Sequence, residues 1–248
     1  MKLAVISDIH SDLISLEKAL KKIRDAGCDR ILCLGDIVGY DYHYAGHLNG
    51  RDPNACVKMV RENCDDVILG NHDLHAILKL PSNHREIGMP GDWYELDLGE
   101  RARISDNRFW LYDDELDDPL NEESRVYLMQ LKEMLVIEDK KLNILATHFI
   151  WPDITGSMQR SPASLKDFRE HLKLVKMNRC VVGLAGHAHL EGYAQISKKV
   201  YGMNYYRKAD LMSQSQVIIV PAITRGKGRN GYLVLDTTEL NFEAIPFD

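Results

Sequence analysis

Short apolar runs separated by amphipathic stretches dominate the first 190 residues. Each run has the pattern of a strand buried on both faces of a sheet. We therefore predict strands at residues 3–6, 31–34, 67–69, 142–146 and 180–185. Apolar residues at helical spacing predict helices over residues 13–23, 53–63, 74–80 and 121–132, and one that begins at Ser161-Pro162. Strand, helix and strand follow one another within about 30 residues, which implies right-handed parallel crossovers and an α/β protein.

The chain departs from this alternation in two places. Residues 82–119 mix aromatic and charged side chains and end in an acidic run, which predicts an insertion with one or two short helices. It is either a cap that shapes a pocket or a segment that only packs on the fold and exposes its acidic side chains to solvent. Beyond it, the pattern predicts a hairpin of residues 134–137 with 142–146, and later strands at 190–197, 200–206, 216–220, 231–236 and 240–246. We expect one domain over residues 1–248 with 82–119 as its insertion.

Polar side chains stand where the predicted strands end. Asp8 and His10 follow the first strand, and residues two apart in an extended segment point the same way. The other polar residues at strand ends are Asp36, Asn71, His72, Asp73, His148, His187 and His189. Because parallel strands end at one edge of a sheet, we expect Asp36 beside Asp8. Two adjacent carboxylates repel each other unless a cation lies between them.

Each of these histidines, taken alone, is best explained as a core residue, but five of them at strand ends with two Asp and one Asn are hard to explain by packing. Mixed imidazole and carboxylate ligands suit Mn, Fe, Zn or Ni. Seven of the residues are candidate metal ligands, enough for two divalent ions that share a bridge, and His72 is the candidate proton donor. Asp73 is a possible orienting partner of His72.

Other polar residues have simpler explanations. Asp12 is well placed to cap the first helix. His43 and His47 are expected in an exposed loop and His171 on a helix surface. The basic glycine loop at residues 226–231 reads as a hairpin turn, although Arg225, Lys227 or Arg229 could help to hold a phosphate.

Composition narrows the class of protein. The net charge of −6 argues against general nucleic-acid binding, but it is compatible with a phosphate substrate because bound metal ions invert the local charge. Five cysteines without a C-x-x-C pair predict free thiols in a reducing compartment. No apolar run approaches the roughly 18 residues of a membrane span, and a strand begins directly after Met1. We therefore expect a cytoplasmic protein without membrane association.

The motifs Asp8-x-His10, Gly35-Asp36, Gly70-Asn71-His72-Asp73, His148 and Gly186-His187-x-His189 together resemble the calcineurin-like metallophosphoesterases, in particular small bacterial and archaeal phosphodiesterase-like members. The resemblance implies two mixed β-sheets packed face to face with flanking helices. It also implies that Asp36 bridges two ions. One ion would be held by Asp8, His10, Asp36 and His189, and the other by Asp36, Asn71, His148 and His187.

The implied activity is hydrolysis of a small phosphodiester or phosphomonoester, possibly a nucleotide, by a hydroxide that the two ions activate. His72 would protonate the leaving alkoxide. Two alternatives remain open. The first is a non-catalytic protein-binding module of the same fold, which typically lacks the histidine at position 72. The second is a protein phosphatase, which usually has Asp-Arg where this chain has Gly39-Tyr40. Trp93 or Trp110 could stack on a base, which would favour a nucleotide, but core packing is the better explanation of either.

Overall fold

Two six-stranded mixed β-sheets packed face to face form the body of the protein. The computed structural model describes every residue except 42–47, 117–118, 227 and 248. The first sheet has the order β11 (Lys208–Asp210), β14 (Asn241–Pro246), β13 (Gly231–Asp236), β1 (Lys2–Ile6), β2 (Arg30–Cys33), β4 (Asp66–Val67). The second has the order β10 (Tyr201–Asn204), β9 (Tyr193–Ser197), β12 (Gln216–Pro221), β8 (Val182–Leu190), β7 (Ile144–Thr147), β6 (Met134–Ile137). The fold expected from the sequence is confirmed.

The apolar runs form buried strands because both faces of each sheet are covered. In β1, Leu3 and Val5 belong to the cluster between the sheets, whereas Ala4 and Ile6 belong to the cluster beneath the helices. Strands β1, β2 and β4 pair in parallel, as do β7, β8 and β12. Their carboxyl ends therefore meet along one edge of the sandwich.

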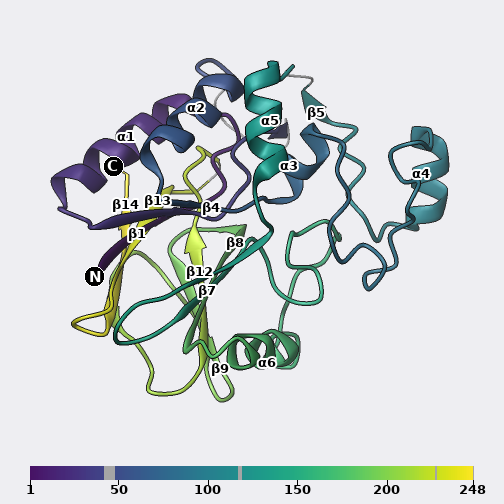
Figure 1. The fold of residues 1–248 in the computed structure, drawn as a ribbon. Coiled ribbons are helices and arrows are strands. Elements are labelled where there is room, and N and C mark those ends of the chain that lie inside the picture. Colours follow the sequence, from purple (N-terminus) through teal and green to yellow (C-terminus); the bar gives the residue numbers. More distant parts are fainter. Residues whose placement is uncertain (42–47, 117–118, 227, 248) are drawn as a thin grey trace.

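Helices cover the outer face of each sheet. Helices α1 (Leu13–Asp25), α2 (Pro53–Asn63) and α5 (Glu122–Gln130) lie over the first sheet, and α6 (Arg169–Met177) lies against the second (Figure 1). Asp12 caps α1 as expected, since its carboxylate accepts a hydrogen bond from the Ser15 amide.

Two helices begin later or earlier than the sequence predicts. The helix expected from Ser161 begins at Arg169, because the Asp167 carboxylate accepts hydrogen bonds from the amides of Ala163 and Ser164 and folds that stretch into a turn. The helix expected at residues 74–80 is α3 (Asn71–Ala76). It begins earlier because Gly70 serves as its N-cap, with the Gly70 amide donating to the Asp73 carboxylate.

His171 is buried rather than exposed, which corrects the surface position expected for it. It lies on the face of α6 that packs against the second sheet, and its Nδ1 accepts a hydrogen bond from the Trp151 amide at 3.1 Å. Helical spacing alone does not show that a backbone amide will meet this ring.

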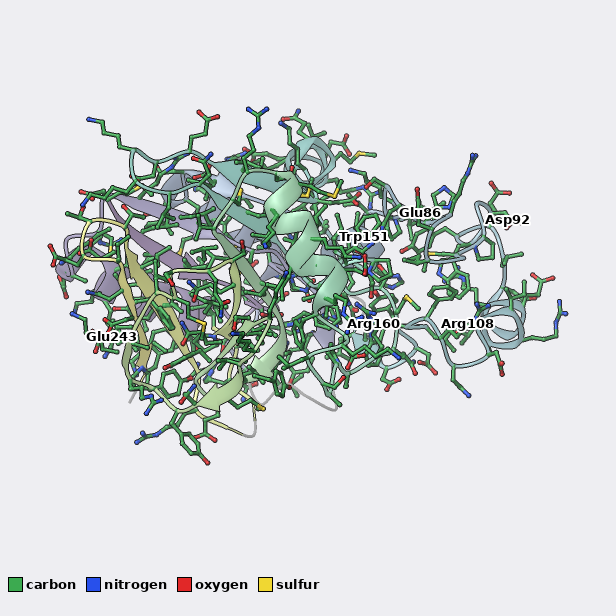
Figure 2. All side chains as sticks on the ribbon, turned by 90° about the horizontal axis from the view of Figure 1, so that it is seen from below. Glu86, Asp92, Arg108, Trp151, Arg160 and Glu243 are labelled. Atoms are coloured by element: carbon green, nitrogen blue, oxygen red, sulfur yellow. The ribbon has the colours of Figure 1, made fainter. Side chains whose placement is uncertain are left out.

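The segment between α3 and α5 projects from the sheets and carries its own small core. Helix α4 (Leu98–Ser105) lies well away from the body of the protein in both views (Figures 1 and 2). Trp93 packs edge to face on Phe109 in a cluster with Ile87 and Met89. Because Trp93 is fully buried there, it serves as packing and cannot stack on a ligand. The segment returns to the body at β5 (Glu115–Leu116), which pairs with β3 (Tyr40–Asp41).

Candidate metal centre

The polar residues predicted at strand ends converge at one edge of the sandwich. Asp8 follows β1, Asp36 follows β2, His148 follows β7, and both His187 and His189 lie in the last part of β8. The backbone does not remain extended there as expected for Asp8 and His10. Strand β1 ends at Ile6, and left-handed φ angles occur at Asp8, His10, Asp36, His187 and His189. Left-handed conformations of non-glycine residues cost about 1–3 kcal/mol each and gather at functional sites.

Glycines beside these residues leave the space that the polar groups occupy. A Cβ on Gly70 would lie 2.1 Å from Asp36 Oδ1, and a Cβ on Gly186 would lie 2.7 Å from Asp8 Oδ2. A Cβ on Gly156 would lie 2.5 Å from His187 Nδ1. The glycines of the motifs are therefore required for close approach of the carboxylates and imidazoles to backbone.

Ligand atoms gather in overlapping groups that share Asp36 and His10. Among the described residues, three groups have ligand atoms within 4.8 Å of one another: Asp8, His10 and His189; Asp36, His148 and His187; and His10, Asp36 and His72. Asp36 Oδ2 lies 3.1 Å from His148 Nε2 and 3.7 Å from His10 Nε2. Asp36 is thus placed between the first two groups, where a bridging carboxylate belongs.

The imidazole rings of this centre are held by backbone carbonyls. His10 Nδ1 lies 2.9 Å from the Gly39 carbonyl oxygen, and His148 Nδ1 lies 2.8 Å from the Leu34 carbonyl oxygen. With its proton on Nδ1, the His10 ring presents the Nε2 lone pair to the centre, an arrangement typical of metal-bound histidine. Burial opposes a charge on His148, but Asp36 outweighs burial and raises the pKa of His148 to about 10, so that Nε2 also carries a proton where a metal ion would replace it. Burial, together with His72 and His189, lowers the pKa of His10 to about 3. Burial likewise lowers the pKa of His187 to about 3, so both rings are neutral near pH 7.

The carboxylates of the centre carry charge despite their burial. Burial opposes ionisation of Asp36, but the neighbouring His148 and His72 hold its pKa well below the usual range. Burial also opposes ionisation of Asp8, yet contact with His189 and the charge of His148 lower its pKa. Two buried, ionised carboxylates beside the neutral rings of His10 and His187 form an environment that attracts cations.

Asn71 supplies the clearest sign that a cation fits here. Its Nδ2 donates a hydrogen bond to the Tyr112 hydroxyl at 3.2 Å, which turns Oδ1 the other way. Oδ1 is buried and has no hydrogen-bond partner among the described residues. An unsatisfied buried acceptor costs roughly 1–3 kcal/mol, which a cation would offset. The set of imidazole, carboxylate and amide donors suits divalent Mn, Fe, Zn or Ni.

His72 is oriented by a residue that sequence patterns did not reveal. Its Nδ1 lies 2.8 Å from Glu115 Oε2, and its backbone amide donates to Asp36 Oδ1 at 2.9 Å. Glu115 stands in the acidic run 113–118, where nothing distinguishes it from its neighbours. Gly39 makes room for the pair, since a Cβ there would lie 2.7 Å from His72 Nδ1 and 2.6 Å from Glu115 Oε1.

The expected partnership of Asp73 with His72 is wrong. The Asp73 carboxylate accepts hydrogen bonds from the amides of Ile37, Val38 and Gly70, at 2.8, 3.1 and 3.0 Å. Burial and the nearby Asp36 carboxylate raise the pKa of Asp73 to about 7. Asp73 therefore ties the turn after β2 to the start of α3 and does not touch the ring that it was expected to orient.

A cavity of about 520 Å³ opens over this centre. His10, Asp36, His72, His187 and His189 line one end of it. Residues 110–115, from the segment that projects between α3 and α5, line another side. A substrate in the cavity would thus touch both the ligand cluster and the projecting segment.

Other candidate residues lie away from the centre or are occupied. The Arg225 guanidinium pairs with Asp12, Nε to Oδ2 at 2.8 Å and one terminal nitrogen to Oδ1 at 2.9 Å, so its charge is already matched. His43, His47 and Lys227 lie outside the described residues. The five cysteines are free thiols, as predicted. None of the helices built from described residues combines the length and apolar character needed to cross a lipid bilayer.

Solved structures share this architecture over the whole chain. A metallophosphoesterase from Sphaerobacter thermophilus superposes with a TM-score of 0.65 at 21% identity, over 100% of this chain and 88% of that one. The hypothetical protein PH1004 from Pyrococcus horikoshii OT3 gives a TM-score of 0.61 at 16% identity, with the same coverage of both chains. At such low identity these likenesses establish the fold and no more.

Sequence comparison identifies the family. One stretch of 78 residues, 31% of this chain, is 49% identical to the uncharacterized protein MJ0912 of Methanocaldococcus jannaschii and covers 28% of that relative's length. The family model described as calcineurin-like phosphoesterase matches residues 1–191, well over half of the chain and every motif residue from Asp8 to His189. The chain belongs to the calcineurin-like phosphoesterase family.

Proposed function

We propose that the protein is a phosphoesterase that binds two divalent metal ions and hydrolyses a small phosphodiester or phosphomonoester. The observation that carries this proposal is the position of Asp36, whose carboxylate belongs both to a group with His148 and His187 and to one with His10 and His72. A single carboxylate shared between two sets of imidazoles matches a centre in which one residue bridges two ions.

The residues divide into two ligand sets and one acid. Asp8, His10, Asp36 and His189 would hold the first ion. Asp36, Asn71, His148 and His187 would hold the second. Ions bound there would make a water molecule acidic enough to attack near neutral pH and would neutralise charge on the phosphoryl oxygens.

His72 supports the chemistry without being required as a ligand. Its ring lines the cavity and contacts His10 edge to face, with centroids 4.6 Å apart. Glu115 accepts the Nδ1 proton and fixes the ring, and in the imidazolium form Nε2 carries the proton that the ring would donate to the oxygen of a leaving group. A binding module would not need this His–Glu pair, which is why we favour an enzyme.

The residues beside the second motif disfavour a protein phosphatase. Gly39 and Tyr40 stand where such enzymes have Asp and Arg, and Glu115 approaches His72 through the space that Gly39 leaves. The cavity, closed on one side by residues 110–115, suits a small substrate better than a folded protein surface.

The test measures bound metal and turnover together. Purified protein loaded with Mn is assayed with bis-para-nitrophenyl phosphate and para-nitrophenyl phosphate, beside Asp36→Asn, His72→Ala and a control, Asp92→Asn. Asp92 is exposed on the part of the projecting segment that points away from the sheets in Figure 2, and it does not line the cavity. We expect Asp36→Asn to lose both metal and turnover, His72→Ala to lose turnover alone, and the control to behave as the parent.

Metal-free parent protein that is inert toward both esters would contradict the proposal and favour the binding module. Stoichiometric metal binding without turnover of either ester would contradict the enzymatic part alone. Turnover that persists in Asp36→Asn would show that the bridge is assigned to the wrong residue.

A further inference from the structure

The proposed metal ligands, here called the ligand cluster, are Asp8, His10, Asp36, Asn71, His148, His187 and His189. The cavity over the ligand cluster also has an apolar wall, here called the apolar arm. The arm is lined by Phe149, Phe168, Leu190, Ala194, Met203 and Ile219. Four of them, Phe149, Phe168, Ala194 and Ile219, belong to a hydrophobic cluster and are at most 4% exposed, yet they face the cavity. Side chains of this kind normally seal against one another, and here they leave room beside a polar centre.

The arm begins at the ligand cluster itself. Phe149 directly follows His148, and its ring centroid lies 4.4 Å from that of His187. Further out, Phe168 lies 5.7 Å from Tyr201, centroid to centroid. A group attached to a phosphoryl centre held by His148 and His187 would therefore enter the arm directly.

The outer end of the arm is an exposed edge strand. Met203 on β10 lines the cavity and is 63% exposed, and Tyr201 on the same strand is 37% exposed. Strand β10 is the last strand of the second sheet. The apolar lining of the cavity thus includes residues beside the ligand cluster and residues exposed to solvent, which leaves the arm open to a substituent of some length.

The charges around the cavity disfavour a second phosphate. Asp113, Asp114 and Glu115 line its wall. Apart from histidines, Arg160 is the only cationic side chain among the described residues that line it. One terminal nitrogen of its guanidinium donates to the carbonyls of Ile150 and Trp151 at 2.9 and 3.2 Å, so one positive charge faces three carboxylates. Figure 2 shows Arg160 and Trp151 close together where the projecting segment meets the sheets. A polyphosphate chain would need additional cations in the same place.

We propose that the substrate carries one phosphoester and an uncharged apolar group, either an alkyl chain or an aromatic ring, which lies in the apolar arm. This inference rests on the proposed function, since it takes the ligand cluster as the site that holds the phosphoryl group. The arm selects the apolar group by burial, and the acidic wall excludes nucleoside polyphosphates by repulsion.

Alkyl- and arylphosphonates probe the arm without any reaction. Binding of methyl-, butyl-, hexyl- and phenylphosphonate to the Mn-loaded protein is measured by calorimetry. Each methylene that leaves water strengthens binding by up to about fourfold. We expect hexylphosphonate to bind at least about 30-fold more tightly than methylphosphonate. Comparison of butyl-, hexyl- and phenylphosphonate shows whether the apolar arm prefers an alkyl chain or an aromatic ring.

Three variants locate the effect. Ala194→Leu fills the arm, and Met203→Asp places a charge at its outer end on an exposed position that tolerates change. Met177→Asp is the matched control, because Met177 is 78% exposed on α6 and does not line the cavity. We expect the gain from methyl to hexyl to fall by tenfold or more in the first two variants and to persist in the control, with methylphosphonate bound equally by all.

Equal affinity for methyl- and hexylphosphonate would overturn the inference, as would a gain that survives both arm variants. If Ala194→Leu does not fold, Met203→Asp alone decides. Turnover of para-nitrophenyl esters without any chain-length gain would overturn the arm and leave the proposed function standing. Binding that strengthens with chain length, without turnover of any ester, would support the apolar arm and contradict the proposed function.

Discussion

Glu115 Oε2 lies 2.8 Å from His72 Nδ1, although 43 positions separate the two residues in the chain. Glu115 arrives from β5, at the end of the projecting segment, and His72 stands in the first turn of α3. The segment therefore contributes to the centre as well as covering it. Tyr112, from the same segment, accepts the hydrogen bond that turns the Asn71 amide.

Removing the Glu115 carboxylate should reduce turnover and spare metal. Without its partner the His72 ring loses its fixed orientation, and general acid catalysis typically supplies about 10²–10⁴-fold. We expect Glu115→Gln to lower kcat roughly 10- to 100-fold, with KM and bound metal near the parent values. Asp113→Asn, a neighbouring carboxylate, is the control. A change in metal content as large as the change in kcat would instead make Glu115 a structural support of the ligands.

Gly39→Ala should disturb the same pair from the other side. Gly39 has a φ of +85°, and a Cβ on it would lie 2.7 Å from His72 Nδ1. The strained backbone costs about 1–2 kcal/mol, and displacement of the ring by about 1 Å costs up to roughly 100-fold in rate. We expect kcat to fall more than metal binding does, because the Cβ is directed at His72 whereas the Gly39 carbonyl that holds the His10 ring is retained. Parent-like kcat in a stably folded variant would show that the ring has freedom the structure does not display.

The convergence of polar residues at one edge of the sandwich was predictable because hydrophobic runs mark strand ends and parallel strands end together. That argument needs no side-chain detail, and it placed Asp8, Asp36 and His148 at one edge of the sandwich correctly. It failed on the local path of the chain, where Asp8 and His10 adopt left-handed rather than extended conformations. Periodicity describes regular strands and carries no information on the turn that follows them.

Contacts that depend on the projecting segment were not predictable. Glu115 is one of several acidic residues in its run, and only the pairing of β5 with β3 selects it for His72. Asp73 stands next to His72 in the chain, which made it the natural candidate, but three backbone amides satisfy its carboxylate. The prediction from nearness in sequence failed because, on the short helix α3, the side chains of His72 and Asp73 point in different directions.

Metal ions should stabilise the fold as well as support activity. Ligands from β1, β2, β7 and β8 come from both sheets, so an ion that binds the folded state alone ties the sheets together. At a free metal concentration 100-fold above Kd, the gain is about 2.7 kcal/mol. For a chain of this size we expect a rise in Tm of roughly 5–10 °C with Mn. Asp36→Asn should melt at the same temperature with and without Mn. A rise in Tm with Mn as large in that variant as in the parent would contradict the assignment of Asp36 as a ligand of both ions.

His171 should make the protein sensitive to mild acid. Burial lowers the pKa of this histidine to about 3, whereas in the unfolded chain it is about 6.5. Between these values the unfolded state binds a proton that the folded state does not, so stability falls as pH drops below about 6.5. One such group contributes up to about 1.4 kcal/mol per pH unit. Stability near pH 7 is unaffected, because the ring is neutral in both states.

His171→Asn isolates this contribution. The Asn Oδ1 can accept the hydrogen bond that the Trp151 amide now donates to His171 Nδ1, and Asn has no charge to gain in acid. Urea unfolding of both proteins at pH 7.0, 6.0 and 5.0 gives the difference in free energy of unfolding at each pH. The buried rings of His10 and His187 are present in both proteins, so their effect cancels. We expect the difference to shift in favour of the variant by about 1–2 kcal/mol from pH 7 to pH 5. A difference that stays constant with pH would show that the folded protein accepts a proton on His171, through a rearrangement that opens α6 to solvent.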